Sequence, residues 1–370
     1  MPRIVLENVT KRFEKFVAVE NLNMVIEDRE FITLLGPSGC GKTTTLRMIA
    51  GLETPTEGRI TIGDEVVFDS EKGINLSPAK RDIGFLFQNY ALWPHMTVYQ
   101  NIAFGLENLK WPKDEIRKRV TEMLQMMKIE EFEKRYPSEL SGGQQQRVAI
   151  ARTLAPKPKV LFMDEPLSNL DAKLRLEMRT ELKRLHVDTD STFVYVTHDQ
   201  LEAMTLATRV CLIKNGVLQQ YAPPLEVYNR PANLFVADFV GNPTMNMLQG
   251  KAKKIDDTHA EVEFLGHKVS FEAETPFASF NEKVVVGIRP EFIQVDKGPY
   301  EGEIYATLPA GMETTVKLEV NKEIVTSMKF GAVDYKYGSN VKFDITGSGV
   351  ILFDADTTER FAMGKVTLIK

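Results

Sequence analysis

The chain has 370 residues, enough for two or three domains, and 43% of them are hydrophobic and 26% charged. This composition excludes a disordered chain, a collagen and a disulfide-stapled miniprotein, and the net charge of −5 gives no global basic surplus for nucleic acid. Cys40 and Cys211 lie far apart, which indicates a reducing compartment rather than a disulfide framework. The N-terminus lacks the apolar core of a signal peptide, and no apolar stretch is long enough to span a bilayer. We therefore expect a soluble, cytoplasmic, multidomain protein.

The first two thirds of the sequence predict an α/β domain. Short apolar runs, which suit strands buried on both faces of a parallel sheet, occur at Phe31–Leu35, Ile83–Phe87, Val160–Met163 and Phe193–Val196. Apolar residues at helical spacing run from Ile116 to Met127 and from Asp171 to Leu185. A further helix is expected after Gln144, and Pro156 and Pro158 would stop it.

The texture of the sequence changes near residue 240. Residues 1–240 hold 31 Lys and Arg against 32 Asp and Glu, whereas residues 241–370 hold 15 against 19. After the change, short alternating segments dominate and predict a β-barrel or small β-domain. These segments are Glu261–Leu265, Lys268–Glu272, Val284–Ile288, Glu303–Leu308, Thr314–Val320, Val341–Ile345 and Val350–Phe353. We therefore expect domains over 1–240 and 241–370.

A glycine-rich segment fits the phosphate-loop pattern G-x-x-x-x-G-K-[ST], and it follows a predicted strand and opens a helical pattern. Its residues are Gly36, Pro37, Ser38, Gly39, Cys40, Gly41, Lys42 and Thr43, followed by Thr44. Glycines let the backbone wrap a phosphate, and the helix N-terminus faces the anion. The pattern assigns Lys42 to the β- and γ-phosphates of a nucleotide and the Thr43 hydroxyl to Mg²⁺.

Two carboxylates end the predicted strand at 160–163. Asp164 is in the position of a residue that holds Mg²⁺, and Glu165 can polarise an attacking water as a general base. A buried strand that ends in two solvated acids is the plainer interpretation. The phosphate loop earlier in the chain makes nucleotide hydrolysis the favoured one.

Further motifs make the resemblance to a family specific. The run Leu140, Ser141, Gly142, Gly143 and Gln144 matches the signature of ATP-binding cassette (ABC) ATPases and begins its Ser-Gly-Gly 99 residues after Lys42. Gln88 stands where that family has its Q-loop glutamine, Ser168–Asp171 resembles its D-loop, and His198 follows a strand where the family has its switch histidine. The elements occur in the family's order over residues 1 to about 240.

The resemblance implies a head-to-tail dimer of two copies, or of this chain with a close paralogue, around ATP and Mg²⁺. The signature of one subunit would clamp the γ-phosphate bound by the other, with Arg135 reaching the partner's nucleotide. Glu165 and His198 would handle the attacking water, with Lys42 and Gln88 completing the catalytic set. Gln88 would join Thr43 and Asp164 at the metal and sense the γ-phosphate, and Asp171 would couple the two sites. Residues of about 90–155 would form a mobile helical subdomain.

Three residues near the nucleotide have a weaker sequence signal. Phe13 matches the family's adenine-stacking aromatic, although an aromatic packed in an N-terminal sheet is the plainer interpretation. Ala18 matches a further adenine-contact position. Cys40 lies near helix-opening amides that could lower a thiol pKa, so we hypothesise that alkylation blocks the ATPase and that bound ATP protects it. A small residue that merely fits is the preferred explanation of Cys40.

The C-terminal part resembles importer ATPases of the maltose and multiple-sugar type. The resemblance lies in Glu226–Asn246, Val286–Glu291 and Leu352–Ala355, and it implies a regulatory, oligosaccharide/oligonucleotide-binding (OB) type barrel. Two departures are Arg29, where the family commonly has a turn glycine, and 311–315, which only approximates the family's pattern. The resemblance implies two transmembrane permease subunits as partners, an extracellular solute-binding protein as an indirect one, and a peripheral place on the cytoplasmic side of the cell membrane.

Several alternatives remain open on the sequence. A single cassette excludes fused exporters and two-cassette translation factors, and the 99-residue gap leaves no room for the coiled coil of a chromosome-maintenance ATPase. Sugar is the favoured cargo, with polyamine, iron, sulfate or glycerol phosphate as alternatives, and one ATPase can serve several permeases. A nucleic-acid-linked ATPase is a remote alternative because OB-type barrels also bind oligonucleotides, but no nucleic acid is expected. A purely regulatory protein would lack a catalytic acid, whereas Glu165 is present.

Overall fold

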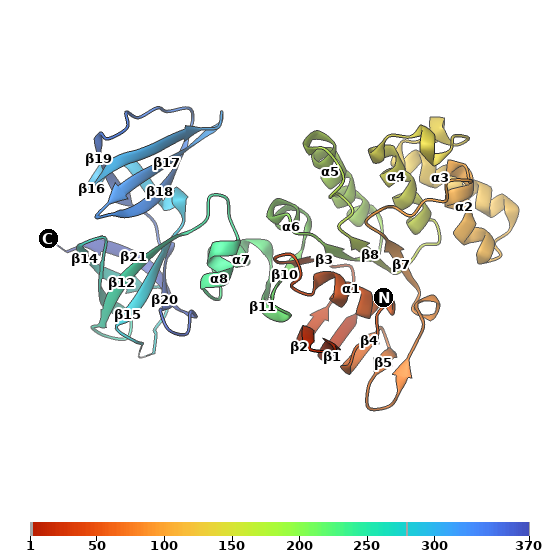
Figure 1. Ribbon diagram of the computed structural model, residues 1–370, viewed down its shortest axis with the longest axis horizontal. Coiled ribbons are helices and arrows are strands. Elements are labelled where there is room, and N and C mark those ends of the chain that lie inside the picture. Colours follow the sequence, from red (N-terminus) through yellow and green to blue (C-terminus); the bar gives the residue numbers. More distant parts are fainter. Residues whose placement is uncertain (1–2, 279, 370) are drawn as a thin grey trace. The chain divides into compact units, whose positions relative to one another are not determined.

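The computed structural model describes residues 3–278 and 280–369. The chain divides into two compact units, which we call the first and the second unit, and the division falls between Pro224 and Leu225 (Figure 1). The sequence pattern predicts a domain boundary at residue 240 instead. The segment between the two positions carries helices α7 (Pro224–Asn229) and α8 (Leu234–Phe239), so nearly all of it counts with the second unit.

Two sheets form the framework of the first unit. The antiparallel sheet has the order β2-β1-β4-β5-β6, with β1 (Ile4–Phe13), β2 (Phe16–Ile26), β4 (Glu57–Ile62), β5 (Glu65–Asp69) and β6 (Ile74–Asn75). The second sheet has the order β11-β10-β3-β9-β8-β7, with β11 (Val217–Ala222), β10 (Arg209–Lys214), β3 (Phe31–Leu35), β9 (Thr192–Val196), β8 (Val160–Asp164) and β7 (Ile83–Leu86). All its neighbours pair in parallel except β11, which runs antiparallel to β10.

Each face of the parallel sheet packs against a different layer, which explains why its central strands are mostly apolar and buried at every position. Phe162 of β8 lies in the same buried cluster as Leu46 of helix α1 (Lys42–Ala50) and residues of the antiparallel sheet. The adjacent Leu161 lies instead in the cluster that contains Leu182 of helix α5 (Ala172–Asp188). Successive side chains of a strand point to opposite faces of the sheet. Because both faces are covered, the side chains on each face are apolar. Helix α6 (Gln200–Leu206) follows β9.

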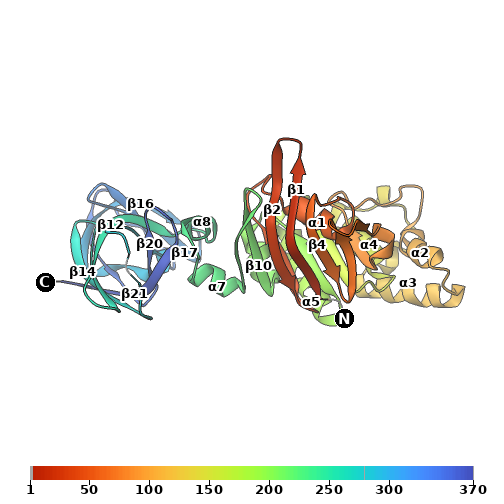
Figure 2. The ribbon, with the colours of Figure 1, turned by 90° about the horizontal axis from the view of Figure 1, so that it is seen from below.

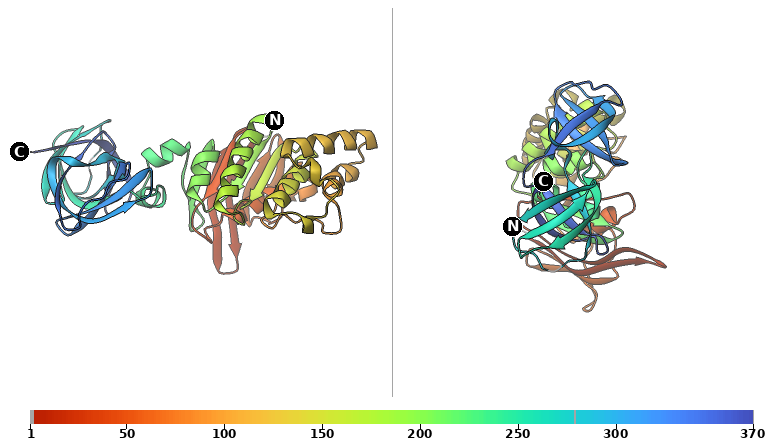
Figure 3. Two further views of the ribbon diagram at one scale, coloured as in Figure 1. Left: turned by 90° about the horizontal axis from the view of Figure 1, so that it is seen from above. Right: turned by 90° about the vertical axis from the view of Figure 1, so that its left-hand side faces the viewer.

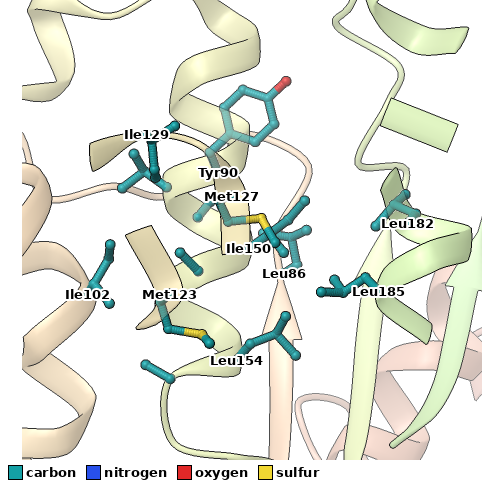
Figure 4. Close-up of a cluster of buried hydrophobic side chains, with 14 of the residues drawn as sticks. Leu86, Tyr90, Ile102, Met123, Met127, Ile129, Ile150, Leu154, Leu182 and Leu185 are labelled. Atoms are coloured by element: carbon teal, nitrogen blue, oxygen red, sulfur yellow. The ribbon is translucent and has the colours of Figure 1, made fainter. Parts of the chain in front are cut away.

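A helical region lies at one end of the first unit, as the tan and yellow helices of Figure 3 show. It comprises α2 (Val98–Asn108), α3 (Lys113–Met127) and α4 (Gly142–Leu154). The predicted apolar face of α3 is confirmed, since its members Ile116, Val120, Met123, Leu124 and Met127 are all buried. They join the cluster of Figure 4, which continues through Leu86 to α5. Within the described ranges, no helix combines the length and apolarity needed to cross a membrane.

The second unit contains a closed barrel and a four-stranded sheet. The barrel order is β12-β13-β14-β21-β20-β15, with β12 (Asn246–Lys254), β13 (His259–Phe264), β14 (His267–Ala273), β21 (Arg360–Leu368), β20 (Val350–Asp354) and β15 (Lys283–Ile288) (Figure 2). The sheet order is β18-β17-β16-β19, with β18 (Glu323–Phe330), β17 (Glu313–Val320), β16 (Ile293–Pro309) and β19 (Asn340–Ile345). The seven predicted β segments all fall on strands, whereas β12, β18 and β21 were not predicted.

A buried arginine fastens helices α7 and α8 to the barrel. Arg289 follows β15 and is 1% exposed. Its Nη1 donates to the carbonyls of Ala237 and Val240, and its Nη2 donates to the carbonyl of Tyr228 at 2.8 Å. The guanidinium carbon lies 4.1 Å from the centre of the Tyr228 ring, which closes one side of the group. Helices α7 and α8 therefore pack as part of the second unit.

Candidate nucleotide-binding site

The phosphate loop joins the end of β3 to the start of α1 and needs glycine at two places. Gly36 has a φ of +152° and Gly41 a φ of +102°, a region that side-chain-bearing residues rarely adopt. A Cβ on Gly36 would lie 2.2 Å from the carbonyl oxygen of Ile213, and one on Gly41 would lie 2.3 Å from that of Ala18. Helix α1 begins after Gly41 without a side-chain cap. Its first amides are therefore available to an anion such as a phosphate.

Lys42 bonds back to the phosphate loop, whereas Thr43 contacts the end of β8. Lys42 is 5% exposed, and its Nζ donates to the carbonyls of Gly36 and Pro37 at 2.8 Å each. The Thr43 hydroxyl donates to Oδ1 of Asp164 at 2.9 Å. A hydroxyl and a carboxylate at this separation fit the oxygen ligands that Mg²⁺ prefers. The structure therefore brings together Thr43 and Asp164, two of the three residues predicted for the metal, directly after Lys42.

Cys40 differs from the sequence expectation. Its side chain is 3% exposed, and its sulfur lies 2.7 Å from where a Gly36 Cβ would be, which places it underneath the loop. Burial raises the pKa of the Cys40 thiol, and the positive charge of Lys42 offsets this only in part. The expectation of a lowered thiol pKa is therefore wrong, because the loss of water around the thiolate outweighs the nearby amides and cation. Cys40 lines the loop through its backbone.

Glu165 and His198 lie side by side at the ends of neighbouring strands. Strands β8 and β9 pair in parallel, so the residues that follow them emerge at the same edge of the sheet. Glu165 has a φ of +45°, and its backbone N–H donates to Val196 at 3.1 Å, which fixes the turn. Its Oε2 lies 3.2 Å from Nδ1 of His198. A carboxylate and an imidazole in contact are a suitable pair for orienting a water and accepting its proton.

Gln88 and the segment after Glu165 form a connected group. Nε2 of Gln88 donates to Oγ of Ser168 at 3.4 Å, and Ser168 donates to the carbonyl of Glu165 at 2.8 Å. Asn169 donates to the backbone carbonyl of Gln88 at 3.2 Å. Asp171 caps α5 by accepting from the amide of Leu174 at 3.0 Å. The predicted Q-loop glutamine therefore contacts the predicted D-loop within one chain.

Sequence reasoning missed a buried polar cluster behind His198. Glu202 is 3% exposed, and its Oε2 accepts from the hydroxyls of Tyr195 and Thr197 at 2.7 Å each. Burial raises the pKa of Glu202, with the two hydroxyl donors acting in the opposite direction. Nε of Arg175 lies 4.0 Å from Glu202. Glu202 falls four residues after His198 in a polar stretch, so the sequence gives no sign that it is buried.

The signature segment opens α4. Ser141 is the N-cap residue, and its Oγ accepts from the amide of Gln144 while the Gln144 side chain accepts from the Ser141 amide at 2.8 Å. Gly142 has open space beside it, whereas a Cβ on Gly143 would lie 2.4 Å from Leu174. The exposed helix start is suited to an anion supplied from outside the chain.

Three remaining predicted residues lie outside these contacts. Arg135 carries its guanidinium 5.0 Å from the Phe132 ring, and its backbone pairs with Phe132 and Val98. Phe13 is 43% exposed at the end of β1, opposite Phe16 in the register of β1 and β2. Ala18 is buried, and its carbonyl oxygen lies where a Cβ on Gly41 would have to fit. Phe13 is therefore available for stacking, whereas Ala18 borders the phosphate loop through its backbone.

Comparison with known proteins agrees with this arrangement. The family model described as ABC transporter matches residues 19–168, and the model described as MalK OB fold domain matches residues 241–293. The trehalose/maltose import ATP-binding protein MalK of Thermococcus litoralis is 50% identical over 79% of this chain and 78% of its own length. The sn-glycerol-3-phosphate import ATP-binding protein UgpC of Bartonella quintana is 43% identical over 97% of this chain and 99% of its own length.

Solved structures resemble the first unit. A dimeric ATP-binding cassette in a post-hydrolysis state, bound to ADP and phosphate, matches with 35% identity and a TM-score of 0.52. The match covers 60% of this chain and 98% of the cassette. The similarity therefore extends to a cassette whose structure contains the products of ATP hydrolysis.

Proposed function

Because the chain belongs to the ATP-binding proteins of ABC transporters, we propose that it is the ATP-hydrolysing, energy-coupling subunit of a sugar importer. The observation that carries the proposal is the contact between Glu165 and His198 beside the phosphate loop, with Asp164 and Thr43 paired next to it. These residues combine an anion site, a metal site and a base at one edge of one sheet. The barrel, matched by the MalK OB model, supports the importer assignment.

In the proposed mechanism the loop amides and Lys42 bind the phosphates of ATP. Lys42 releases the carbonyls of Gly36 and Pro37 as it does so. Thr43, Asp164 and Gln88 would hold Mg²⁺, which would supply charge neutralisation for the transferred phosphoryl group. Glu165 accepts the proton of the attacking water, and His198 keeps Glu165 and that water in place. Phe13 stacks on the adenine, with Ala18 and Thr44 close by.

We further propose that two copies, or one copy and a close paralogue, enclose the nucleotide head to tail. Leu140, Ser141, Gly142, Gly143 and Gln144 of one subunit would then cover the γ-phosphate bound by the other, with Arg135 and Asp171 at the same contact. Closure and reopening of this dimer would move two permease subunits that receive the solute from an extracellular binding protein. The chain would thus work on the cytoplasmic face of the membrane as a peripheral subunit.

Sugar is the proposed cargo, and glycerol phosphate is the main alternative. The name of the T. litoralis relative specifies trehalose and maltose, whereas that of the B. quintana relative specifies sn-glycerol 3-phosphate. The resemblance of Glu226–Asn246 to the junction of maltose- and multiple-sugar-type importer ATPases favours sugar. Polyamine, iron and sulfate importers remain alternatives of the same class.

Glu165→Gln tests the hydrolytic role. Glutamine keeps the size of the side chain but cannot accept a proton, so we expect turnover to fall by about 100-fold or more while ATP drives the chain into a stable dimer. Steady-state phosphate release and size-exclusion chromatography with ATP measure the two effects. Glu177→Gln, an exposed change on α5, is the control. Wild-type turnover in Glu165→Gln would refute the assignment of the base.

Co-purification from native membranes tests the transport role. The tagged full-length chain should retain two permease subunits. When these are reconstituted with their binding protein, maltose or trehalose should stimulate ATP hydrolysis more than glycerol 3-phosphate or spermidine does. Stimulation by glycerol 3-phosphate alone would show that the cargo is glycerol phosphate and not sugar. The absence of any co-purified permease would refute the importer assignment.

A further inference from the structure

Two consecutive residues just after Gln88 have an unusual backbone conformation. Tyr90 has a φ of +61° and Ala91 a φ of +47°. Neither is a glycine, and side-chain-bearing residues adopt this left-handed region only at a cost in energy. The turn is closed by hydrogen bonds from the Tyr90 amide to Phe87 and from the Ala91 amide to Asn89. A strained turn of this kind persists only when its surroundings hold it.

Arg152 holds this turn from the last turn of helix α4. Its Nη2 donates to the carbonyl of Tyr90 at 2.7 Å, and its Nη1 donates to the carbonyl of Ala91 at 2.6 Å. Its guanidinium carbon also lies 4.8 Å from the centre of the Trp93 ring. Burial lowers the pKa of Arg152 to about 10, so the side chain remains charged at neutral pH. One side chain therefore binds both carbonyls of the strained pair and the ring that follows.

The neighbours of the turn are fixed as well. The Tyr90 side chain is 7% exposed and belongs to the same buried cluster as Met127 and Ile150 (Figure 4). Trp93 is held through its backbone by Asn101, whose side chain accepts from the Trp93 amide at 2.9 Å and donates to its carbonyl at 3.2 Å. Tyr90 and Trp93 are thus each tied to the helical region by contacts other than those of Arg152.

Helix α4 also carries the signature segment at its other end. Ser141 caps the start of α4, and Arg152 lies in its last turn. A single helix therefore joins the predicted clamp for the partner's nucleotide to the turn that follows Gln88.

We propose that Arg152 is a positioning residue that stabilises the left-handed turn at Tyr90 and Ala91 and thereby places Gln88 at the metal site. The inference rests on the proposed function, because it takes Gln88 to act at Mg²⁺ and the γ-phosphate. Arg152 itself touches neither. Its effect is on the affinity of the catalytic site for Mg²⁺ rather than on the binding of the nucleotide base.

The test compares Arg152→Met with Arg119→Met in the full-length chain. Arg119 of α3 is a matched control, because its guanidinium also donates to two backbone carbonyls, those of Leu154 at 2.9 Å and Ala155 at 3.0 Å. We expect Arg152→Met to raise the Mg²⁺ concentration for half-maximal ATPase activity by about tenfold. We expect Arg119→Met to leave this concentration within about twofold of wild type.

Ala91→Gly provides the second variant. Glycine adopts a positive φ without strain, so it should restore at least half of the lost Mg²⁺ affinity when combined with Arg152→Met. Thermal unfolding midpoints of all variants show whether stability alone explains a change. Equal shifts in Arg152→Met and Arg119→Met, or no rescue by Ala91→Gly, would overturn the inference. A wild-type chain without Mg²⁺-dependent ATPase activity would instead refute the proposed function.

Discussion

The phosphate loop and the barrel junction each bury a cation against backbone carbonyls, and the two cations have different surroundings. Lys42 of the first unit donates to Gly36 and Pro37. Arg289 of the second unit donates to Tyr228, Ala237 and Val240. Lys42 lies beside the uncapped start of a helix, where an anion can replace its partners. Arg289 is covered by the Tyr228 ring, and burial lowers its pKa.

The difference shows that a buried cation alone does not make a ligand site. What distinguishes Lys42 is its place beside an uncapped helix start, where a bound phosphate can compete for its hydrogen bonds. The bonds of Arg289 join two helices to the end of strand β15. The buried cation Lys42 is thus placed for chemistry, whereas the buried cation Arg289 serves structure.

Lys42→Met should show the largest effect on turnover. Removing the cation takes away charge stabilisation of the transferred phosphoryl group, so ATPase activity should fall by about 100-fold or more. The free energy of unfolding should fall by only about 1 kcal/mol, because two neutral acceptors lose one donor. Phosphate release and urea denaturation measure both, with the exposed Lys72→Met as control. Activity above a tenth of wild type would contradict the assignment of Lys42.

Arg289→Met should show the opposite pattern. Three buried carbonyls would lose their donor, so we expect the second unit to lose about 3 kcal/mol of stability while the ATPase of the first unit persists. Both tryptophans, Trp93 and Trp111, lie in the first unit. Tryptophan fluorescence therefore follows that unit alone, and calorimetry follows both.

The control for Arg289→Met is Arg230→Met. Arg230 forms an exposed ion pair with Glu274 at 3.0 Å, and such pairs contribute about 1 kcal/mol or less. In Arg289→Met, the unfolding midpoint from tryptophan fluorescence could fall as much as the calorimetric midpoint of the second unit. That outcome would contradict a purely structural role of Arg289 within the second unit.

Phe13→Ala tests a smaller contribution within the first unit. Loss of a stacking ring should raise the KM for ATP by about tenfold and leave kcat nearly unchanged. Phe16→Ala is the matched control, because Phe16 is also exposed, at 58%, and faces Phe13 across the same turn. A larger KM effect from Phe16→Ala than from Phe13→Ala would move the adenine contact to Phe16.

Glu202→Gln should have the smallest effect, a change in the pH dependence of stability. Burial raises the pKa of Glu202, so between about pH 4.3 and that raised pKa the folded chain binds more protons than the unfolded chain. Stability from this group therefore falls as pH rises through the window. Glutamine does not ionise, so the variant should gain stability relative to wild type as pH rises. Parallel curves of thermal midpoint against pH for wild type, Glu202→Gln and the exposed Glu177→Gln would contradict this.

The sequence predicted the elements whose burial is complete or periodic. Strands β3, β8 and β9 are buried at every position, and an unbroken apolar run shows this directly. Strand β12 was missed because its inward positions include Leu248 and Ala252 among Gln, Gly and Lys, which form no apolar run. The bulges in β1 likewise break the alternation that would have indicated the N-terminal sheet.

The candidate site was predictable where motif spacing marks it, and less so where long-range packing decides the environment. The phosphate loop, Asp164 and Glu165 follow from local pattern. The direction in which the Cys40 pKa shifts could not be predicted in this way, because it depends on burial beneath the loop. In the sequence, Arg152 cannot be distinguished from other polar residues of a helix. The left-handed turn at Tyr90 and Ala91 contains no glycine that would indicate it. Their relation emerges only when α4 lies beside the Q-loop.

The cap of helix α4 has a consequence for how a neighbouring subunit is recognised. The Ser141 oxygen accepts from the Gln144 amide, so its lone pair is engaged inside the chain while its hydroxyl proton is free to be donated outward. The helix cap uses the oxygen of this O–H group, and the proposed recognition of a phosphate would use its hydrogen. Aspartate at position 141 would keep the cap and place a negative charge towards the partner's ATP. We expect such a variant to fold as a monomer but not to dimerise with ATP. Folding and association would thus depend on different properties of the same side chain.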